Sequence, residues 1–372
     1  MTPASLAAIF DALPDPALVV RADAWSAGRR VIMANTAARD MFRIIEAQPM
    51  IAQVIRRPDL LDLVEAALTG AAGGEVEWET AGEVQDRRLR ALVRPLPAQD
   101  DGGRLTLVIV RDETDARRNE RMRADFLANA SHELKTPLAS LAGFIETLRG
   151  HAKDDAGARE KFLGIMATQV ERMVRLVGDL MSLSRIELNE HIPPTGEVDL
   201  LASARDVAET LSPIATAADV TIKVDGDAPA AVVGDALQIL QVLQNLVENA
   251  VKHSAPSGVV RVEVETGLAQ ADITAARDPA AASRSLLLPS AVSGARFQVV
   301  RVINDGPGIP REYLPRLTER FYRAPGQKSG DTTGTGLGLA IVKHIINRHH
   351  GGLFVESAEG RGATFTAYFP QV

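Results

Sequence analysis

Residues 126–138 read FLANASHELKTPL and lie within a stretch, starting near residue 115, that has the composition of a helix. With Ser131 filling one gap, apolar residues recur every three or four positions at Leu127, Leu134, Leu138, Leu141, Ile145 and Leu148. This heptad spacing places them on one helical face. His132 lies one residue off that face, so its imidazole is expected to face solvent. Pro137 lacks an amide hydrogen and is expected to kink the helix just after His132.

A second helix is expected over residues 158–188. There the apolar pattern is repeated by Phe162, Met166, Met173, Leu176, Leu180 and Leu183. The polar residues 151–157 between the two helices predict a turn, and therefore an antiparallel hairpin. Because one hairpin buries little apolar surface, we expect two copies to pair as a dimeric four-helix bundle. A plain spacer coiled coil is the more common use of heptads, and this hairpin pattern alone leaves that alternative open.

The regions on either side of the hairpin differ from it in pattern. Residues 1–114 contain short β-rich runs separated by turn clusters, which is typical of a small α+β domain. The hairpin domain is expected over 115–190. After a Pro/Gly linker, residues 197–372 alternate helix and strand, which predicts an α/β sandwich with a mixed sheet. Residues 267–295 are rich in Ala, Ser, Asp and Pro and are interpreted as a surface insertion, partly disordered.

Composition excludes several classes of protein. Apolar residues make up 46% and charged residues 24% of the 372, which is ordinary for a globular chain. The net charge of −7 gives no electrostatic reason for direct nucleic-acid binding. With no Cys, disulfides, Fe–S clusters, Cys-ligated zinc and thiol nucleophiles are excluded. No membrane span or signal peptide is evident, so we expect a cytoplasmic chain, or a membrane-associated one if it is a shortened form of a membrane sensor.

Three segments of residues 197–372 carry groups suited to a nucleotide. Gly334-Thr335-Gly336-Leu337-Gly338 leads into a predicted helix, whose N-terminal amides suit phosphate. Asp305 lies in a tight Gly/Pro turn after a predicted strand, where its carboxylate can accept a hydrogen bond from an exocyclic amine such as that of adenine. Asn245 and Asn249 share one helical face, and their amide oxygens suit a hard cation such as Mg²⁺. Each motif alone also fits an ordinary turn, glycine cluster or helix surface.

His132 is a candidate nucleophile. An exposed histidine beside a carboxylate can attack an electrophile, while Glu133 orients the ring and takes its proton. A lone surface histidine more often has no such role, so the assignment depends on the other motifs of the chain.

The joint order of six motifs resembles that of the sensor histidine kinases of two-component signalling, over about residues 115–372. In chain order they are the segment around His132 (H box), 245–253 (N box), 305–309 (first G box), 319–323 (F box), 334–339 (second G box) and 360–365 (final glycine motif). Residues 126–150 and 314–323 look like the phosphate-regulon subfamily, which raises phosphate sensing as a hypothesis. Residues 1–112 are similar to a PAS domain, closed by Asp112-Glu113-Thr114.

The resemblance implies a function. The γ-phosphoryl group of ATP would pass to His132, with Glu133 as base, and then to an aspartate of a response regulator. Thr136 would also support dephosphorylation of the regulator. The implied cofactors are ATP and Mg²⁺. The implied partners are a second copy of the chain and a receiver domain, with no nucleic acid.

The resemblance also implies the nucleotide contacts. Asn249 would hold Mg²⁺, and Asn245 and Lys252 would lie near the phosphates. Asp305 would bind the adenine amine, with His253 beside the ring. Arg323 would reach the phosphates from the start of a mobile lid over about residues 324–333. The other implied contacts are Gly308, Ile309, Gly334, Gly336, Leu337, Gly338 and Thr364.

Alternatives remain at this point. A non-catalytic nucleotide-binding scaffold could use the same fold, although such proteins usually lose His132, Asn249 or the second G box, all present here. An ATPase of the gyrase and Hsp90 type would need a glutamate to activate water where this chain has Asn245, and an amide cannot act as that base. For Thr136, the alternative is structural: its hydroxyl would bond the carbonyl of His132.

Overall fold

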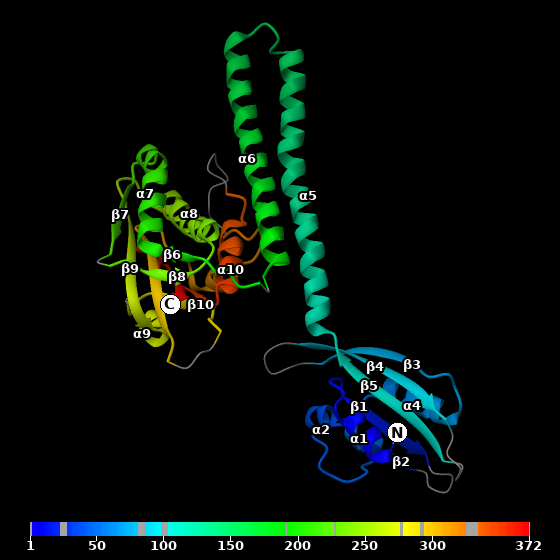
Figure 1. Ribbon diagram of the computed structural model, residues 1–372. Helices are drawn as coiled ribbons and strands as arrows, with labels where there is room; N and C mark the ends of the chain where they lie inside the picture. The colour runs from blue at the N-terminus through cyan, green and yellow to red at the C-terminus, as the bar shows by residue number, and fades with distance from the viewer. Residues whose placement is uncertain are drawn as a thin grey trace. The chain divides into compact units, whose positions relative to one another are not determined.

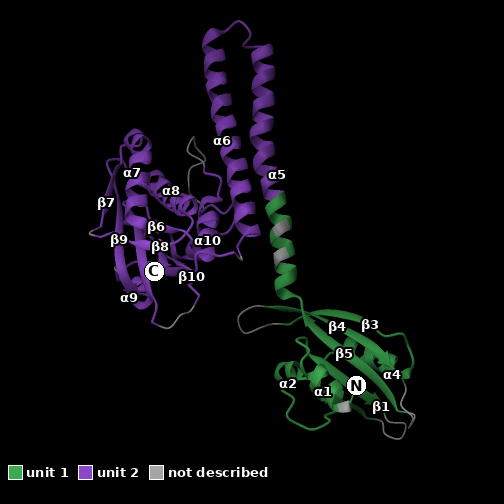
Figure 2. Ribbon diagram, viewed as in Figure 1, with its two compact units in different colours: residues 1–127 green, residues 128–372 purple. Residues whose placement is uncertain are grey.

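The computed structural model describes residues 2–22, 28–80, 86–97, 103–190, 192–226, 228–275, 278–290, 294–324 and 334–371. It divides into two compact units, residues 1–127 and 128–372, which are coloured separately in Figure 2. Among the described residues, no helix combines the length and the apolar character needed to cross a membrane.

The first unit is an antiparallel five-stranded sheet with strand order β2-β1-β5-β4-β3 (Figure 1). Its strands are β1 (Ala17–Ala22), β2 (Arg29–Ala34), β3 (Gly74–Thr80), β4 (Arg87–Leu96) and β5 (Arg104–Asp112). Its short helices are α1 (Pro3–Asp11), α2 (Thr36–Phe42), α3 (Ile51–Val54) and α4 (Pro58–Thr69). Leu60 and Val64 of α4 pack into one core with Val93 and Val108 of the sheet. This is the α+β domain that the sequence predicted.

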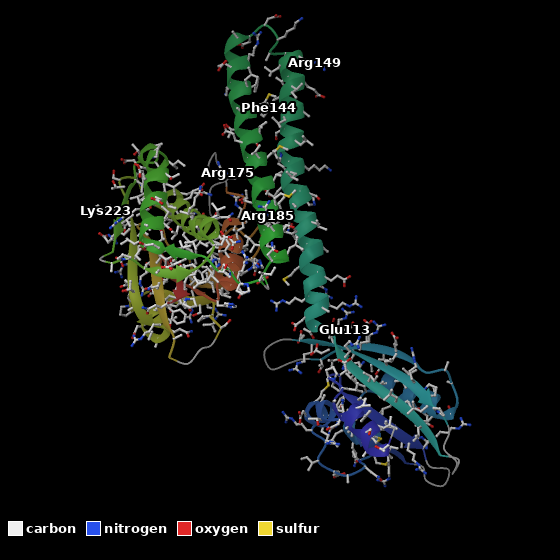
Figure 3. The ribbon with its side chains drawn as sticks, in the orientation of Figure 1. Glu113, Phe144, Arg149, Arg175, Arg185 and Lys223 are labelled. Atoms are coloured by element: carbon white, nitrogen blue, oxygen red, sulfur yellow. The ribbon has the colours of Figure 1, made fainter. Side chains whose placement is uncertain are left out.

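Ion pairs join this sheet to the helix that follows it. The charged side chains that pair between β3 and β4 are Glu75, Glu77, Glu79, Arg88, Arg90 and Arg94. At the junction with the next helix, Glu113 Oε1 lies 3.5 Å from Arg90 Nη1. One turn later, Arg117 Nη2 lies 3.6 Å from Glu77 Oε1 (Figure 3 labels Glu113). The start of the long helix is therefore tied to the sheet by charge as well as by chain connection.

The hairpin consists of α5 (Thr114–Arg149), which begins in the first unit, and α6 (Ala156–Leu188). Asp155 caps α6, because its side chain accepts a hydrogen bond from the amide of Ala158 at 2.9 Å. The rings of Phe144 and Phe162 stack across the two helices with centroids 5.4 Å apart (Figure 3). The predicted antiparallel hairpin is confirmed, and its helices begin and end within two residues of the expected positions.

The C-terminal domain is built on a mixed six-stranded sheet, as predicted, with order β10-β12-β13-β11-β9-β7. The strands are β7 (Thr221–Asp225), β9 (Val259–Ala269), β10 (Ala282–Leu287), β11 (Arg296–Asn304), β12 (Gly352–Ala358) and β13 (Gly362–Pro370). Only the β7–β9 pair among these is parallel. A two-stranded sheet, β6 (Glu197–Asp199) with β8 (Ala231–Val233), lies beside it.

Helices cover both faces of the six-stranded sheet. The larger layer is α7 (Leu200–Ala217), α8 (Ala236–His253) and α10 (Gly338–Arg348); a 3-10 helix, η1, spans Arg311–Arg316. Val299 and Tyr368 are direct partners across β11 and β13, and they pack with Ile273 of the short α9 (Gln270–Thr274). Since side chains alternate along a strand, the neighbouring Val300 is on the face of the larger layer. Residues 267–295, expected as a surface insertion, thus include a helix and a strand of the sheet.

Candidate functional site

The candidate phosphoacceptor, His132, is an exposed residue of α5. Its neighbour Glu133 is held from the second helix: Glu133 Oε2 accepts a hydrogen bond from Arg172 Nη2 at 2.8 Å. Thr136 Oγ1 donates to the backbone carbonyl of His132 at 3.2 Å. That is the contact expected under the structural alternative for Thr136, so the dephosphorylation role of this residue stays a prediction.

Helix α8 carries the two candidate amides on its half-buried side. It begins at the cap Asp235, whose carboxylate accepts hydrogen bonds from the amides of Leu237 and Gln238. Its apolar face is buried in the domain, which fixes the direction of the opposite residues. Asn245 Nδ2 donates to the carbonyl of Gln241 at 2.9 Å. A Cβ built on Gly338 would lie 2.7 Å from Asn245 Oδ1, so this amide packs directly against the start of α10.

The second glycine segment, residues 334–338, lies between the other nucleotide motifs. Gly336 has φ +74°, and a Cβ there would lie 2.9 Å from the backbone of Phe321 in the F box. Phe321 in turn donates its amide to the carbonyl of Gly336 at 2.9 Å. A Cβ on Gly334 would lie 3.1 Å from Lys252 Nζ. These glycines leave backbone exposed beside a lysine at the N-terminus of an 11-residue helix, an arrangement suited to phosphate.

The Asp305 loop, residues 304–310, contains glycines packed closely against neighbouring backbone. Any other residue in their place would force the backbone to move. A Cβ on Gly306 would lie 2.2 Å from the carbonyl oxygen of His253. Gly308 has φ +75°, and its Cβ would lie 2.2 Å from the carbonyl oxygen of Ala358. The Asp305 carboxylate is exposed, with Arg261 Nη2 4.0 Å away. The loop therefore presents a solvent-facing carboxylate next to the C-terminal end of α8, where His253 lies.

The final glycine motif, residues 360–365, contacts the Asp305 loop and supports it. Gly360 donates its amide to the carbonyl of Pro307 at 2.7 Å. A Cβ on Gly362 would lie 1.8 Å from the carbonyl oxygen of Asn304. Ser357 of β12 accepts a hydrogen bond from the amide of Ile309 and donates one to the carbonyl of Gly362, each at 2.8 Å. The predicted contact Thr364 lies two residues further along β13.

Basic side chains gather where phosphates are expected. Burial lowers the pKa of Lys252, and the nearby positive charge of Arg323 lowers it further. Burial, followed by the charges of Lys252 and Arg323, lowers the pKa of His253 to about 4, so this ring is neutral at pH 7. The mutual repulsion of Lys252 and Arg323 would be relieved by a bound polyanion. Most of the predicted lid that follows Arg323 lies outside the described residues.

Helix α6 contacts the C-terminal domain at this site. Thr335 Oγ1, within the second glycine segment, donates to Asp179 Oδ2 at 2.6 Å. Burial raises the pKa of Asp179, and the bond from Thr335 opposes that rise. Arg175 Nη1 lies 3.7 Å from Glu248 Oε1 of α8 (Figure 3 labels Arg175). These contacts are with α6, whereas His132 is an exposed residue of α5. Among the described residues, the structure gathers the nucleotide residues but gives no contact between them and His132.

Because burial lowers the pKa values of three histidines of the C-terminal domain, we expect the folded protein to lose stability in acid. His253 binds a proton less readily when folded, at about pH 4, than when unfolded, near 6.5. Its contribution is therefore complete above about pH 6.5 and is lost as the pH falls toward 4, up to about 3 kcal/mol. Burial lowers the pKa of His344 and His349 as well, with the same sign.

The measurement is urea unfolding of the full chain between about pH 7 and about pH 5, compared with His253→Tyr, which carries no titrating group in that range. The variant should lose less stability than wild type over this interval. An equal loss in both proteins would show that His253 does not contribute.

Sequence reasoning missed three residues that the structure places at these motifs. Arg172 holds Glu133, Asp179 binds Thr335, and Ser357 holds the Asp305 loop. Arg172 and Asp179 belong to the heptad helix α6, but nothing local in the sequence indicates their distant partners. Ser357 carried no signal at all, because its role depends on the pairing of strands.

Comparison with known proteins found three family models that match successive parts of the chain. "Histidine kinase-, DNA gyrase B-, and HSP90-like ATPase" matches residues 234–372. "His Kinase A (phospho-acceptor) domain" matches residues 122–189, and "PAS domain" matches residues 4–74. The predicted PAS domain, phosphoacceptor hairpin and ATP-binding domain are thus confirmed, while the individual site residues stay predictions.

Similar curated proteins are sensor kinases. The phosphate regulon sensor protein PhoR of Pseudomonas aeruginosa is 36% identical over 271 residues, covering 72% of this chain and 54% of that protein. The sensor-like histidine kinase SenX3 of Mycolicibacterium smegmatis is 33% identical over 275 residues, covering 73% and 64%. The sensor histidine kinase WalK of Bacillus subtilis is 27% identical over 264 residues, covering 71% and 39%. The chain therefore spans about half to two thirds of the length of the first two relatives.

Proposed function

We propose that this chain, which belongs to the sensor histidine kinases of two-component signalling, transfers the γ-phosphoryl group of ATP to His132 and then to an aspartate of a response regulator. The observation that carries the proposal is the gathering of the second glycine segment, Lys252 and Asn245 around one helix N-terminus. The proposed substrates, ATP and a receiver domain, are those of the cytoplasm, so we expect the reaction to take place there.

The residues present fit ATP with Mg²⁺. Glycines that a Cβ would fill, together with two cations, suit the phosphates, and the exposed carboxylate of Asp305 suits the adenine amine. Asn249 would offer an amide oxygen to Mg²⁺, which commonly takes few protein ligands beside substrate phosphates. The metal would neutralise charge on the transferred group, as in other phosphoryl transfers.

The protein's own part in the reaction is to position groups and move one proton. One ring nitrogen of His132 attacks the γ-phosphorus, the bond from that phosphorus to the oxygen of the β-phosphate breaks, and ADP leaves. The proton on the other ring nitrogen passes to Glu133. Lys252 and Arg323 offset negative charge on the phosphates. Because position 245 is an amide and not a carboxylate, water has no base there, and the phosphoryl group is kept for His132.

The direct test uses ATP labelled in its γ-phosphate. With Mg²⁺ the chain should acquire label that is stable in base and lost in acid, as expected for a phosphorylated histidine. It should pass that label to an aspartate of a purified receiver domain. Binding of ATP without any labelling would instead favour the non-catalytic scaffold.

We further propose that the chain acts as a homodimer through α6. One face of this helix is apolar and exposed, with residues spaced by threes, fours and sevens: Leu163, Val170, Val174, Val177, Met181 and Leu188. Two residues of the expected α6 seam, Leu176 and Leu183, are only 2% and 0% exposed within one chain. On α6, the surface available to a second copy is therefore this exposed face and not the whole predicted seam.

The dimer proposal predicts a strong effect of charge on the exposed face. The double variant Val174→Lys/Met181→Lys should weaken dimerisation at least about a thousandfold, because two apolar side chains on each copy would be replaced by charges. Sedimentation of the full chain measures the effect. Thr168→Lys, an exposed position off this face, is the control. A dimer that survives the double change would require another interface.

Thr136 gives a separate prediction about dephosphorylation. Thr136→Ala should retain autophosphorylation and transfer but slow the decay of the phosphorylated regulator, because the hydroxyl would position the attacking water. Thr136→Ser keeps the hydroxyl and is the control. The measurement is the lifetime of regulator phosphate with unlabelled kinase and ADP. An unchanged lifetime would leave only the hydrogen bond to His132 as the role of Thr136.

Phosphate sensing is the finer proposal. It is supported by the likeness of residues 126–150 and 314–323 to the phosphate-regulon subfamily and by the printed name of one relative. It predicts that deleting the gene removes the response of phosphate-regulated genes to phosphate limitation. A normal response would separate this chain from that role and leave the kinase proposal intact.

A further inference from the structure

The segment 267–295 contributes a strand to the edge of the C-terminal sheet. Strand β10 pairs antiparallel with β12 and lies outside it, so that β12 has hydrogen-bonded neighbours on both sides. Ala282 of β10 is the direct partner of Ser357. Ser357 is 3% exposed and is the residue that holds the amide of Ile309 at the end of the Asp305 loop. The added strand therefore pairs with the strand residue that fixes this loop.

A second contact from the same segment reaches the loop's other support. Asp278 Oδ2 lies 3.0 Å from Arg361 Nη1. Arg361 stands between the two glycines of the final glycine motif, and one of these, Gly360, donates its amide to the carbonyl of Pro307. In addition, η1, which follows the Asp305 loop in sequence, packs against β10. The segment thus contacts the elements on either side of the loop.

The segment is itself anchored. Ile273 of α9 is fully buried against Phe297, Phe354 and Tyr368. Its carbonyl lies 3.5 Å from Nη1 of Arg301, a side chain that is 2% exposed and pairs with Glu265. A charged group buried at that depth is costly to leave without a partner, so α9 is held in one place on the sheet. The rest of the segment is therefore connected to a helix whose position on the sheet is fixed.

From these contacts we propose that residues 267–295 position the Asp305 loop and thereby set the affinity for ATP. The inference rests on the proposed function, because it assumes that Asp305 binds adenine. Asp278 is then a positioning residue that acts through Arg361 and the final glycine motif. Catalysis at His132, on another domain, should be unaffected once ATP is bound.

The first test reverses one charge in the full chain. Asp278→Arg would repel Arg361, and we expect the Kd for ATP and the KM for autophosphorylation to rise about threefold to tenfold, with kcat unchanged. The double variant Asp278→Arg/Arg361→Asp restores opposite charges and should bring the Kd close to wild type. The control, Asp272→Arg, makes the same change at an exposed position of α9.

The second test removes β10 alone. Residues 282–287 are replaced by a glycine-serine linker of equal length, which keeps α9, Asp278 and β11. The Kd for ATP should rise more than about tenfold, because β12 would lose the strand that pairs with it at Ser357. Thermal unfolding without nucleotide reports whether the domain is folded, and if this variant is unfolded the charge-reversal set decides.

Three results would overturn the proposal. An unchanged Kd in Asp278→Arg would show that the segment does not affect ATP binding. An equal rise in Asp272→Arg would show that it acts only through general charge. A raised Kd that the charge swap leaves unrestored would mean that Arg361 contacts ATP itself. Failure of the wild-type chain to label His132 would contradict the proposed kinase activity instead, and the ATP-binding measurements would still test this inference.

Discussion

Replacing His132 with alanine is expected to abolish acid-labile labelling from ATP, with a loss of more than about a thousandfold, because the proposed mechanism assigns the bond to phosphorus to this ring. The Kd for ATP should stay within about twofold of wild type. Within the part of the chain that the structure describes, His132 has no contact with the residues of the nucleotide site, and it is an exposed residue of α5.

The measurement combines γ-phosphate labelling with direct binding of a fluorescent ATP analogue. His151→Ala is the matched control, because His151 is also an exposed histidine of the hairpin. Label that persists in His132→Ala would place the phosphoacceptor elsewhere. A large loss of ATP binding would contradict the separation between the acceptor helix and the nucleotide site.

The second large effect is expected from Gly308→Ala. Its φ of +75° is strained for alanine, and the new methyl group would lie 2.2 Å from the carbonyl oxygen of Ala358, a backbone atom that cannot turn away. The Asp305 loop must therefore move, and we expect the Kd for ATP to rise more than about a hundredfold, a cost of about 3 kcal/mol. Titration of the full chain with ATP measures the loss.

Gly360→Ala separates the collision from the backbone strain. Gly360 has the same φ of +75°, but a Cβ there meets nothing within 4 Å. This control should cost only the strain of about 1 kcal/mol and raise the Kd for ATP about fivefold or less. If both variants bind ATP equally, the contact between Gly308 and Ala358 does not determine the loop's position.

Local sequence signals were sufficient for much of the fold. The heptad spacing and the polar turn predicted both hairpin helices, and short β-rich runs between turn clusters predicted the strands of the first domain. Sequence analysis did not place α4, although its signals were present: Pro58 begins it, and Leu60, Val64 and Leu68 are spaced by fours. These local signals are enough to predict this helix, without any contact between distant residues.

Other features depend on contacts between distant residues. Strand β10 has the sequence ASRSLL, without apolar alternation, and it forms only because β12, far along the chain, offers an edge. Likewise, the seam predicted for α6 did not distinguish residues such as Leu183, buried within the chain, from those such as Val174, which stay exposed. Both apolar sets have helical spacing, and only tertiary contacts decide which one is covered.

The candidate site likewise combines residues that local sequence motifs indicate with residues that only the tertiary structure brings to them. Motif order indicated candidate residues. Apart from Gly360, the motif glycines described above occupy positions where a side chain would collide with neighbouring backbone or with the side chains of Asn245 and Lys252. The residues that hold the motif side chains, such as Arg172 on Glu133, come from other elements and carry no local pattern. A sequence can thus identify groups that react before it identifies groups that orient them.

The ion pairs between the first sheet and α5 indicate where the PAS domain should be exchanged for another domain. A fusion that joins a foreign sensor at Asp112 would discard Glu77 and Arg90 but keep Arg117, which would lose its partner on the sheet. A junction placed after Glu120 transplants the acids, the bases and the first turns of the helix together. Chimeras cut at the later point should therefore inherit an intact coupling between sensor and helix.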